Sequence, residues 1–592
     1  MREGYIEDYI SRLEVKGTPE EVQAVQPLSK ILVEDYGYPV ENIITHPQHR
    51  VKVRPSDTKK EYPIDIGVFT NAAKKDEDLF IVCECKKKTR KDGIDQLKDY
   101  LRFCTAELGV WYNGEERVFL RKIEKDGKVF FEEIPNIPRY GQRVEDIGKF
   151  KRAELKTTHN LKGVFKAIRN YLAANTVGAT RDEVLAQQLI NIIFCKIYDE
   201  RHTAPEDIVT FRAGVDEKPQ AVKDRISALF NSVKTRYTGV MDKADEVTLD
   251  PASVVYVVGE LQNYCLIDAE RDTIADAFEV FIDHALKGGQ GQFFTPRNVV
   301  KMMVEMLDPN EDESVIDPSC GSGGFLIESL RYAWKKIDEK GNKYNWTDAD
   351  LESERADFAQ SNVAGIDKDY FLAKVAKAYL SILGVNKSNI FCEDSLERPE
   401  NWNTKTKMKI SKGSFNVLLT NPPFGSKIPV QGEDKLAQYE LGYKWAKDRK
   451  SGEWGKGKLK DKESPQVLFI ERDLQLLADY GRMAIVLPDG VFGNDTFSYI
   501  RQWLKSQGRI LAVIDVPIET FQPNTSTKTS VLVFQKLPAD KIPEDYDIFM
   551  SIVQTCGHDR RGNETDSDEI QLVAAKYHEW LVKHPLEIEG EV

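Results

Sequence analysis

The sequence of 592 residues lacks several features that define whole classes of protein. It has no run of 18 apolar residues, so we expect no membrane-spanning helix, and MREGYIEDYI at its start is not a signal peptide. Its eight cysteines are scattered, and the close pair Cys83 and Cys85 has no second pair or neighbouring histidine to complete a zinc site. No G-x-x-x-x-G-K-[S/T] loop follows an expected strand, which argues against an ATPase. We therefore expect a cytoplasmic protein without a membrane anchor, a zinc site or an ATP motor.

Basic residues are fewer than acidic residues, and the formal net charge is −13. This argues against a protein that coats nucleic acid with its whole surface. Two local basic runs remain: Lys86 to Lys91, and residues 444–462, in which eight Lys and Arg residues interleave with Trp445 and Trp454. The second run is either a solvated loop or a local contact with DNA, and its composition leaves both open.

The chain is too long for one core, and its pattern changes several times along its length. Residues 1–138 alternate helix and strand signals, and the apolar spacing of residues 151–287 is helical. Residues 288–540 alternate strands and helices in the manner of a doubly wound sheet. In the remaining segment, 541–592, an amphipathic helix around 572–582 could dock on a partner or pack on its parent domain. We expect a multidomain α/β protein with a helical domain in the middle.

A glycine-rich turn follows one of the expected strands, in SVIDPSCGSGGFLIESL. The strand ends at Asp317, the turn contains Gly321, Gly323 and Gly324, and a helix follows. Glycine lets a ligand approach the backbone closely, and the start of the helix offers free N–H groups. A plain strand–helix turn is the simpler interpretation. A nicotinamide enzyme would use G-x-G-x-x-G, which differs, and Asp317 suits a cationic ammonium better than a phosphate.

Two further acids follow the next expected strands. Asp367 ends the strand in AGIDKDY, where a carboxylate can accept from both hydroxyls of a ribose. Asp394, in NIFCEDSL, is placed to accept from an adenine amino group. Each acid taken alone would more often be a helix cap or a solvated residue. Their position after the glycine turn favours a shared role in binding a nucleoside.

The stretch SFNVLLTNPPFGS places an apolar strand directly before Asn421, Pro422, Pro423 and Phe424. Proline has a fixed φ and no N–H, so the two prolines form a stiff turn. The Asn421 side chain and the Pro422 carbonyl would then offer two acceptors to one amino group, and Phe424 would offer a face on which a flat ring stacks. The plain alternative is a strand end that happens to contain prolines.

Four motifs together resemble those of the N6-adenine DNA methyltransferases: QFFTP at 292–296, DPSCGSGGF, NPPF and KTSVLVF. More closely, they resemble the modification subunits of type I and type I-like restriction systems, over about residues 155–540. The resemblance implies a Rossmann-like methyltransferase domain with S-adenosylmethionine as its cofactor. It implies that the cofactor contacts Phe294, Thr295, Pro296, Asp317, Ser319, Gly321, Gly323, Asp367, Asp394 and Asn421. It also implies that Asn421, Pro422, Pro423 and Phe424 hold an adenine flipped out of double-stranded DNA.

The amino-terminal segment contains a second group of chemical residues. Asp65 follows EYPI, and Glu84 and Lys86 lie two apart on an expected strand, which directs their side chains to the same face. Two carboxylates and a lysine at one point could hold Mg²⁺ and position a water against a phosphodiester. Gln96 and Tyr100 lie four apart on one face of the next helix. The alternative is an ordinary solvated strand with charged residues.

The run from PEEVQAV through PIDIGVF, VCECK and QLKDY resembles the amino-terminal nuclease of type I restriction subunits, a PD-(D/E)xK fold with a trailing QxxxY. The resemblance implies that Asp65, Glu84 and Lys86 form the catalytic trio and that Gln96 and Tyr100 form the helix signature. It also suggests Glu21 as a further ligand of the metal, beside Asp65 and Glu84. One departure is Ile64, which separates the proline from the aspartate.

Only 56 residues follow Lys536, fewer than the target-recognition domain of a stand-alone methyltransferase with this motif order. We therefore expect a separate specificity subunit and a hetero-oligomer. A nuclease and a methyltransferase in one chain resemble the BcgI-type (type IIB) restriction–modification catalytic subunits, which either methylate or cut DNA. Two alternatives stay open. The nuclease-like domain could be an inactive scaffold in a defence system, or the methyl group could go to protein glutamine.

Overall fold

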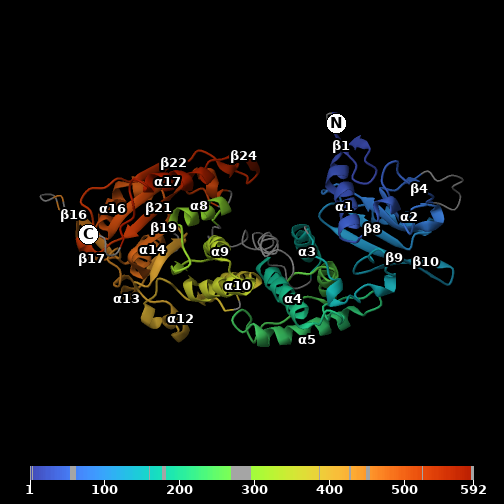
Figure 1. The fold of residues 1–592 in the computed structure, drawn as a ribbon, viewed down its shortest axis with the longest axis horizontal. Helices are drawn as coiled ribbons and strands as arrows, with labels where there is room; N and C mark the ends of the chain where they lie inside the picture. Colours follow the sequence, from blue (N-terminus) through green and yellow to red (C-terminus); the bar gives the residue numbers. More distant parts are fainter. Residues whose placement is uncertain are drawn as a thin grey trace. The chain divides into compact units, whose positions relative to one another are not determined.

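The computed structural model describes residues 2, 4–53, 62–158, 160–176, 182–267, 295–385, 387–425, 429–448, 452, 454–522 and 525–588. They form two compact units, Met1–Ala285 and Leu286–Val592, shown in Figure 1. Within the described ranges, no helix has the length and apolar content needed to cross a membrane. The finer boundaries expected near residues 138 and 540 remain predictions.

The first unit contains a six-stranded sheet with the order β10-β9-β8-β7-β6-β3. Its neighbours are antiparallel except for β7 and β8, which are parallel and are connected through helix α2 (Ile94–Phe103). The strands are β3 (Ile43–Ile44), β6 (Ile66–Phe69), β7 (Leu79–Cys85), β8 (Leu108–Tyr112), β9 (Arg117–Lys125) and β10 (Lys128–Glu133). The strand expected around Glu84 and the helix expected to contain Gln96 and Tyr100 are thus confirmed.

Alternation along β7 divides the core of this sheet into two layers. Ile81, Cys83 and Cys85 pack with helix α1 (Gln26–Glu34) on one face. Val82, between them, packs with α2 on the opposite face. The two cysteines are fully buried and form no disulfide, so they act as small apolar side chains, as their isolated position in the sequence suggests.

The described part of the first unit contains four further α-helices after the sheet. They are α3 (Leu161–Asn175), α4 (Asp182–His202), α5 (Pro219–Arg236) and α6 (Pro251–Leu261). The helical pattern expected from about residue 151 is therefore confirmed for the described residues. Helix α4 is apolar around much of its circumference, and it also buries an ion pair between Lys196 and Glu200, with Nζ 3.1 Å from Oε1.

A buried ion pair connects the sheet of this unit to its helices. Arg117, at the start of β9, binds Glu260 of α6 with both its Nε and Nη2 atoms, and Nε lies 2.7 Å from Oε2. Both side chains are at most 4% exposed. The Asn136 amide also donates to the Gly259 carbonyl at 2.9 Å. Because charges this deeply buried must stay paired, the two parts of the unit are held in one arrangement.

Replacement of Arg117 by alanine should strongly destabilise the first unit, because it leaves the Glu260 carboxylate buried without a cation. We expect a loss of about 3–5 kcal/mol in the free energy of unfolding. Hydrogen exchange of peptides from residues 108–125 and 251–261 at increasing urea would measure it. The matched control is Arg143→Ala, since Arg143 is 81% exposed in its pair with Asp146 and should contribute at most about 1 kcal/mol. Equal effects of the two variants would contradict the importance of the buried pair.

The second unit is built on an eight-stranded sheet with the order β13-β12-β11-β14-β19-β21-β20-β22. Strand β21 is antiparallel to β19 and β20 on its two sides, and the other pairs are parallel. The strands are β11 (Val315–Asp317), β12 (Val363–Asp367), β13 (Asn389–Cys392), β14 (Phe415–Thr420), β19 (Leu477–Pro488), β20 (Gly508–Asp515), β21 (Thr529–Lys536) and β22 (Phe549–Ile552). The direction of the strand order reverses between β11 and β14, and such a point is where open α/β sheets bind ligands.

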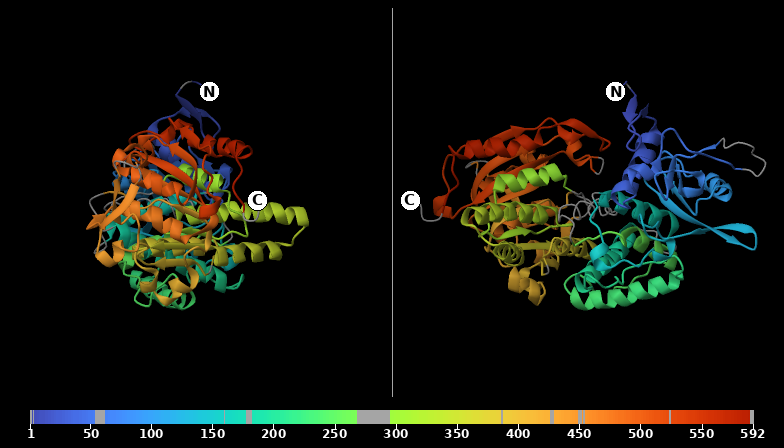
Figure 2. Two further views of the ribbon diagram at one scale, coloured as in Figure 1. Left: turned by 90° about the vertical axis from the view of Figure 1, so that its left-hand side faces the viewer. Right: turned by 45° about the vertical axis from the view of Figure 1, so that its right-hand side comes forward.

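Helices cover both faces of this sheet. They are α8 (Arg297–Leu307), α9 (Gly324–Tyr344), α11 (Tyr370–Ile382), α14 (Pro465–Leu476), α16 (Ser498–Lys505) and α17 (Val573–Leu581), and α10 (Asp348–Asp357) packs on α9. Helix α9 begins at Gly324, as the glycine turn predicts. Figure 2 shows α9 and α10 side by side. The doubly wound arrangement is confirmed, with β21 as an antiparallel insertion that the alternation of elements does not reveal.

The carboxyl-terminal helix α17 packs on its own unit. Val573, Ala574 and Tyr577 are buried, and the His578 Nε2 atom lies 2.7 Å from the Glu305 carbonyl of α8. The sequence left open whether this amphipathic helix docks on a partner or packs on its parent domain. Its apolar face packs on the parent domain.

The basic run is not a plain loop where the structure describes it. Residues Tyr443–Lys447 (β16) and Trp454–Leu459 (β17) form an antiparallel two-stranded ribbon. The loop interpretation of this run is wrong for these residues, because the aromatic side chains between the lysines provide an apolar face for packing.

Candidate functional site

Four strands of the second unit deliver the sequence motifs to one crevice. The carboxyl ends of β11, β12 and β14 and the residues after β13 border a cavity of about 460 Å³. Its lining includes Ser319, Gly321, Asp367, Asp394, Asn421, Pro422 and Pro423. A smaller cavity of about 60 Å³ is lined by Thr295, Asp317 and Phe325, among others. Ser319, Gly321 and Asn421 border both cavities, so the two spaces adjoin.

The glycine turn has a conformation that requires glycine. Gly321 and Gly323 have φ values of 54° and 92°. A Cβ atom on Gly323 would also lie 3.2 Å from the Cβ of Ala376 on α11. At Gly321 a Cβ atom would meet nothing within 4 Å, so the open space beside this residue belongs to the cavity. Gly323 lines neither cavity and is instead the N-cap residue directly before helix α9.

Asp317 lies at the bottom of the smaller cavity and is 1% exposed. Its Oδ1 accepts from the Ser319 backbone N–H at 2.9 Å and from the Thr420 hydroxyl at 2.8 Å. Burial raises the pKa of Asp317 to about 7, despite these two hydrogen bonds, and the nearby Asp367 charge adds to the rise. A cationic group entering this cavity would favour the ionised carboxylate.

Asp367 and Asp394 occupy the larger cavity in different ways. Asp367 accepts from the backbone N–H groups of Gly321 at 2.9 Å and Asp369 at 2.8 Å, which ties the glycine turn to β12. Burial raises the pKa of Asp367. Asp394 accepts from the Leu396 N–H at 2.9 Å and is paired with the ammonium of Lys435. Lys435 also lines the cavity, and no motif in the sequence identifies it.

Asn421 contains the most informative atom of the site. Its side-chain N–H donates to the Thr295 hydroxyl at 2.9 Å. Its Oδ1 is buried and has no hydrogen-bond donor among the described residues. A buried acceptor without a donor costs free energy unless a ligand supplies one. The amide is therefore held by Thr295, and Asn421 borders both cavities while its buried acceptor lacks a donor.

The remaining residues of the predicted site have mixed outcomes. Thr295 lines the smaller cavity, and Pro296 precedes helix α8. Phe294 lies outside the described residues. Phe424 is partly buried and lines neither cavity, so its proposed stacking on a base remains a prediction.

In the first unit, the structure brings together the acid–lysine group of the sequence. The Asp65 carboxylate accepts from the Cys85 N–H at 2.7 Å, which places it beside Glu84 on β7, and Lys86 donates to Glu84. Burial raises the pKa of Asp65 to about 6. Burial and the Asp65 charge raise the pKa of Glu84 to about 7.

The helix signature lies against the same group. Gln96 donates to the Tyr100 hydroxyl, which donates to the Pro63 carbonyl at 3.3 Å. Burial raises the pKa of Tyr100, and the charges of Glu84 and Asp65 contribute to this rise. All five residues expected from the sequence are therefore neighbours in the structure.

Glu21 lies in a different set of contacts. Its two carboxylate oxygens bind His46 at 2.8 Å and Gln26 at 3.0 Å. The preceding residue, Glu20, contributes negative charge that raises the pKa values of both Asp65 and Glu84. Adjacent acids at the start of a helix cannot be distinguished by sequence alone. Glu20 is thus the acid that the sequence analysis missed, and the role of Glu21 as a metal ligand stays a prediction.

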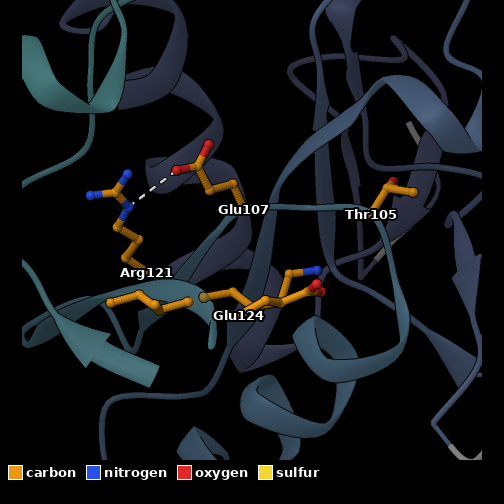
Figure 3. Close-up of a pocket in the computed structure, with 6 residues that line it drawn as sticks. Thr105, Glu107, Arg121 and Glu124 are labelled. Carbon is orange, nitrogen blue, oxygen red and sulfur yellow. Dashed lines mark hydrogen bonds and ion pairs between the residues drawn. The ribbon is translucent and has the colours of Figure 1, made fainter. Parts of the chain in front are cut away.

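Another hollow, of about 510 Å³, lies on the surface of the first unit and is shown in Figure 3. Three of its charged residues, Glu107, Arg121 and Lys122, already have partners. Arg121 binds Glu107 at 3.1 Å and Glu145 at 2.8 Å, and Lys122 donates to the Cys104 carbonyl at 2.7 Å. Nothing converges on a ligand there, so this hollow is not a candidate site.

Comparison with known proteins assigns the class. Residues 269–589, more than half of the chain, match the family model described as N-6 DNA Methylase. The chain belongs to this family. Residues 19–138 match a second model, described as the N terminus of the type I restriction enzyme R protein. The methyltransferase resemblance and the amino-terminal resemblance noted in the sequence are thereby confirmed at the level of family.

Individual relatives are distant. The chain is 25% identical over 371 residues to the type I restriction enzyme EcoEI methylase subunit of Escherichia coli, with 62% of each chain covered. It is 24% identical over 167 residues to the type II restriction enzyme and methyltransferase RM.BcgI of Heyndrickxia coagulans, covering 28% of this chain and 23% of that protein. The chain spans at most 62% of the length of the first curated relatives it matches. A solved structure of a type I R-M system shares the fold, with a TM-score of 0.51, 17% identity, and 73% of this chain and 85% of that chain covered.

The raised pKa of Asp317 predicts a pH dependence for binding of a cationic cofactor. Below pH 7 the carboxyl is mostly protonated and must lose its proton to attract an ammonium. We expect affinity for S-adenosylmethionine to rise by up to about tenfold per pH unit as the pH approaches 7 from below. Calorimetry at pH 6 in two buffers should detect release of a proton on binding.

Two variants test the source of that proton. Asp317→Asn should bind more weakly and without proton release. Asp312→Asn, at an exposed position of the same unit, should behave as the unmodified protein does. Proton release that persists in Asp317→Asn would assign the effect to another group.

Proposed function

We propose that this chain transfers a methyl group from S-adenosylmethionine to N6 of adenine in double-stranded DNA. The observation that carries the proposal is Asn421, which borders two adjoining cavities and whose buried Oδ1 has no donor among the described residues. An adenine can reach this position only after it leaves the base stack, at a cost of a few kcal/mol. Membership of the N-6 DNA methylase family supports the same reaction.

The residues of the crevice fit S-adenosylmethionine. The smaller cavity combines the buried Asp317 carboxylate with the hydroxyl groups of Thr295 and Ser319, a set suited to the ammonium and carboxylate of an amino acid. The larger cavity offers Asp367 to a ribose and Asp394 to an adenine amino group. When bound, this cofactor supplies a methyl group on a sulfonium, which leaves as the neutral thioether.

The protein's own part in the reaction is to hold the acceptor nitrogen. Asn421 Oδ1 and the Pro422 carbonyl would accept the two N–H bonds of the exocyclic amine. Both acceptors are rigid, because Thr295 holds the amide and the proline rings fix the backbone. The nitrogen lone pair is then directed away from the ring and towards the methyl group, and the amine loses its proton to solvent after the new bond has formed. No strong base is needed.

Methylation of a protein glutamine would use a similar grip on an amide nitrogen. The family match favours DNA, and the destination of a labelled methyl group separates the two. Label found on polypeptide rather than on DNA would overturn the choice of substrate.

Replacement of Asn421 by alanine should leave cofactor binding within about twofold and reduce methyl transfer by more than about a hundredfold, since one of the two acceptors is removed. Calorimetry measures the first quantity and incorporation of labelled methyl groups into DNA measures the second. Asn403→Ala, at the exposed start of a short helix in the same unit, is the control and should retain both. Retained transfer in Asn421→Ala would remove this residue from the reaction.

We further propose that the amino-terminal domain is a Mg²⁺-dependent nuclease. Asp65 and Glu84, with raised pKa values of about 6 and about 7, are acids whose charged forms a divalent cation would stabilise. Lys86 is beside them to interact with a phosphate, and the charge of Glu20 acts on Glu84 as well. The match to the amino-terminal model of type I restriction R proteins supports this assignment.

Glu84→Ala should abolish DNA cleavage in the presence of Mg²⁺ and the specificity partner, and should leave methylation unchanged. Glu132→Ala, at an exposed position on the same sheet, is the control. If the unmodified protein does not cut DNA under these conditions and Glu84→Ala changes nothing, the domain is an inactive scaffold.

The proposed assembly follows from the same reasoning. The chain would act in the cytoplasm within a hetero-oligomer whose specificity subunit reads the DNA sequence, in the manner of the BcgI-type enzymes. Coexpression with a specificity subunit and measurement of the mass of the purified complex would test it. A chain that methylates a defined site alone would contradict the need for the partner.

A further inference from the structure

The basic ribbon arises from a segment that leaves the crevice and returns to it. Pro423 and Pro465, at the two ends of this segment, both line the larger cavity. Between them, β15 (Val430–Gln431) lines the same cavity and pairs with β18 (Lys462–Glu463), which directly follows the ribbon. The ribbon is therefore attached to the wall of the proposed site through β18.

Side-chain contacts fix the segment to the body of the unit. The Tyr439 hydroxyl donates to the Leu396 carbonyl at 2.9 Å, and the Gln438 amide donates to the same carbonyl at 3.0 Å. The buried Arg472 of α14 donates to Tyr439 and Gln438. Because Leu396 follows Asp394 closely, the segment and the loop that carries Asp394 form one wall of the cavity.

Aromatic side chains pack the ribbon against helix α16. The rings of Trp445 and Trp454 pack against Tyr499 of α16, with centroid distances of 6.3 and 6.1 Å. The indole N–H of Trp445 donates to the Glu440 backbone carbonyl at 3.1 Å. Lys460 donates to the Tyr499 hydroxyl and the Leu441 carbonyl, each at 3.1 Å. The tryptophans are thus used in anchoring the ribbon.

The exposed side chains of the ribbon are positively charged, and its register places Lys456 beside Trp445 and Lys447 beside Trp454 on one face. The two strands contain four exposed lysines, and they contain no acidic residue. The lysines are Lys444, Lys447, Lys456 and Lys458. Ala446 pairs with Gly455, so one face of the ribbon presents almost no side chains. A phosphate backbone could approach this face closely while the lysines reach it from the edges.

We propose that the β16–β17 ribbon binds the phosphate backbone of duplex DNA beside the nucleotide held in the crevice. This inference rests on the proposed function. A chain with a net charge of −13 needs a local cationic surface to hold DNA, and this one is attached to the wall of the site. A two-stranded ribbon is also narrow enough to lie along a groove.

The chemistry of the ribbon favours DNA over a protein partner. The centres of protein interfaces are enriched in aromatic residues and depleted in lysine. Here the aromatic residues pack on Tyr499, and the exposed groups are lysine ammoniums.

The test replaces all four ribbon lysines by glutamine in the full-length chain. Anisotropy of a labelled duplex of about 30 base pairs, measured from about 50 to 200 mM salt, gives the affinity and its salt dependence. We expect at least tenfold weaker binding at the lowest salt, and a salt slope smaller by about 0.9 for each phosphate that the ribbon no longer neutralises. Binding of S-adenosylmethionine should not change, which would show that the crevice is intact.

The matched control replaces Lys405, Lys407, Lys409 and Lys412, four exposed lysines at and beyond helix α12 (Thr404–Lys409), by glutamine. Its salt slope should stay that of the unmodified protein. An equal loss of affinity in both variants, or an unchanged slope in the ribbon variant, would overturn the inference and leave the proposed function standing. If the ribbon variant keeps the salt slope but no longer binds the specificity subunit, the inference is also overturned. The ribbon would then be a protein-binding surface. Absence of DNA binding by the unmodified chain would overturn both.

Discussion

A hydrogen bond between Thr420 and Asp317, 2.8 Å long, connects the two halves of the proposed methyltransferase site. Thr420 is the last residue of β14, directly before Asn421, and Asp317 is the last residue of β11, before the glycine turn. The hydroxyl oxygens of Ser319 and Thr420 also lie 2.6 Å apart. The turn that would bind the cofactor and the turn that would bind the acceptor base are thus fixed to each other. Group transfer requires such control, because a displacement of about 1 Å can cost a hundredfold in rate.

Buried carboxyl groups with raised pKa values occur at both proposed sites. In the second unit they include Asp317 and Asp367, and in the first unit Asp65 and Glu84. Burial is the leading cause in each case. Holding these acids away from water costs stability, and a bound cation offsets part of that cost. The two sites would bind different cations, an ammonium or sulfonium in one and a metal ion in the other, by the same electrostatic means.

The six-stranded sheet that carries Glu84 is not an independent part of the first unit. Its strand β9 is joined to helix α6 by the buried Arg117–Glu260 pair, and Asn136 bonds to the end of the same helix. Whether the domain cleaves DNA or serves as a scaffold, its acids are carried on a body whose parts cannot easily move apart. This rigidity is compatible with both functions, and only the chemistry of Asp65 and Glu84 distinguishes them.

Much of the site could be predicted from sequence because its signals are local. A strand, Asp317, two glycines and the helix that begins at Gly324 are adjacent in the chain, and each depends on backbone preferences of its own residues. The same holds for Asn421 and the two prolines, and for Glu84 near the end of β7 and Lys86 directly after that strand. Tertiary structure decided what depends on distant partners. It paired Lys435 with Asp394, brought the charge of Glu20 near enough to Glu84 to raise its pKa, inserted β21 antiparallel to its neighbours and folded the basic run into a ribbon on Tyr499. Contacts between residues far apart in the chain depend on packing and charge in three dimensions, and no local pattern records them.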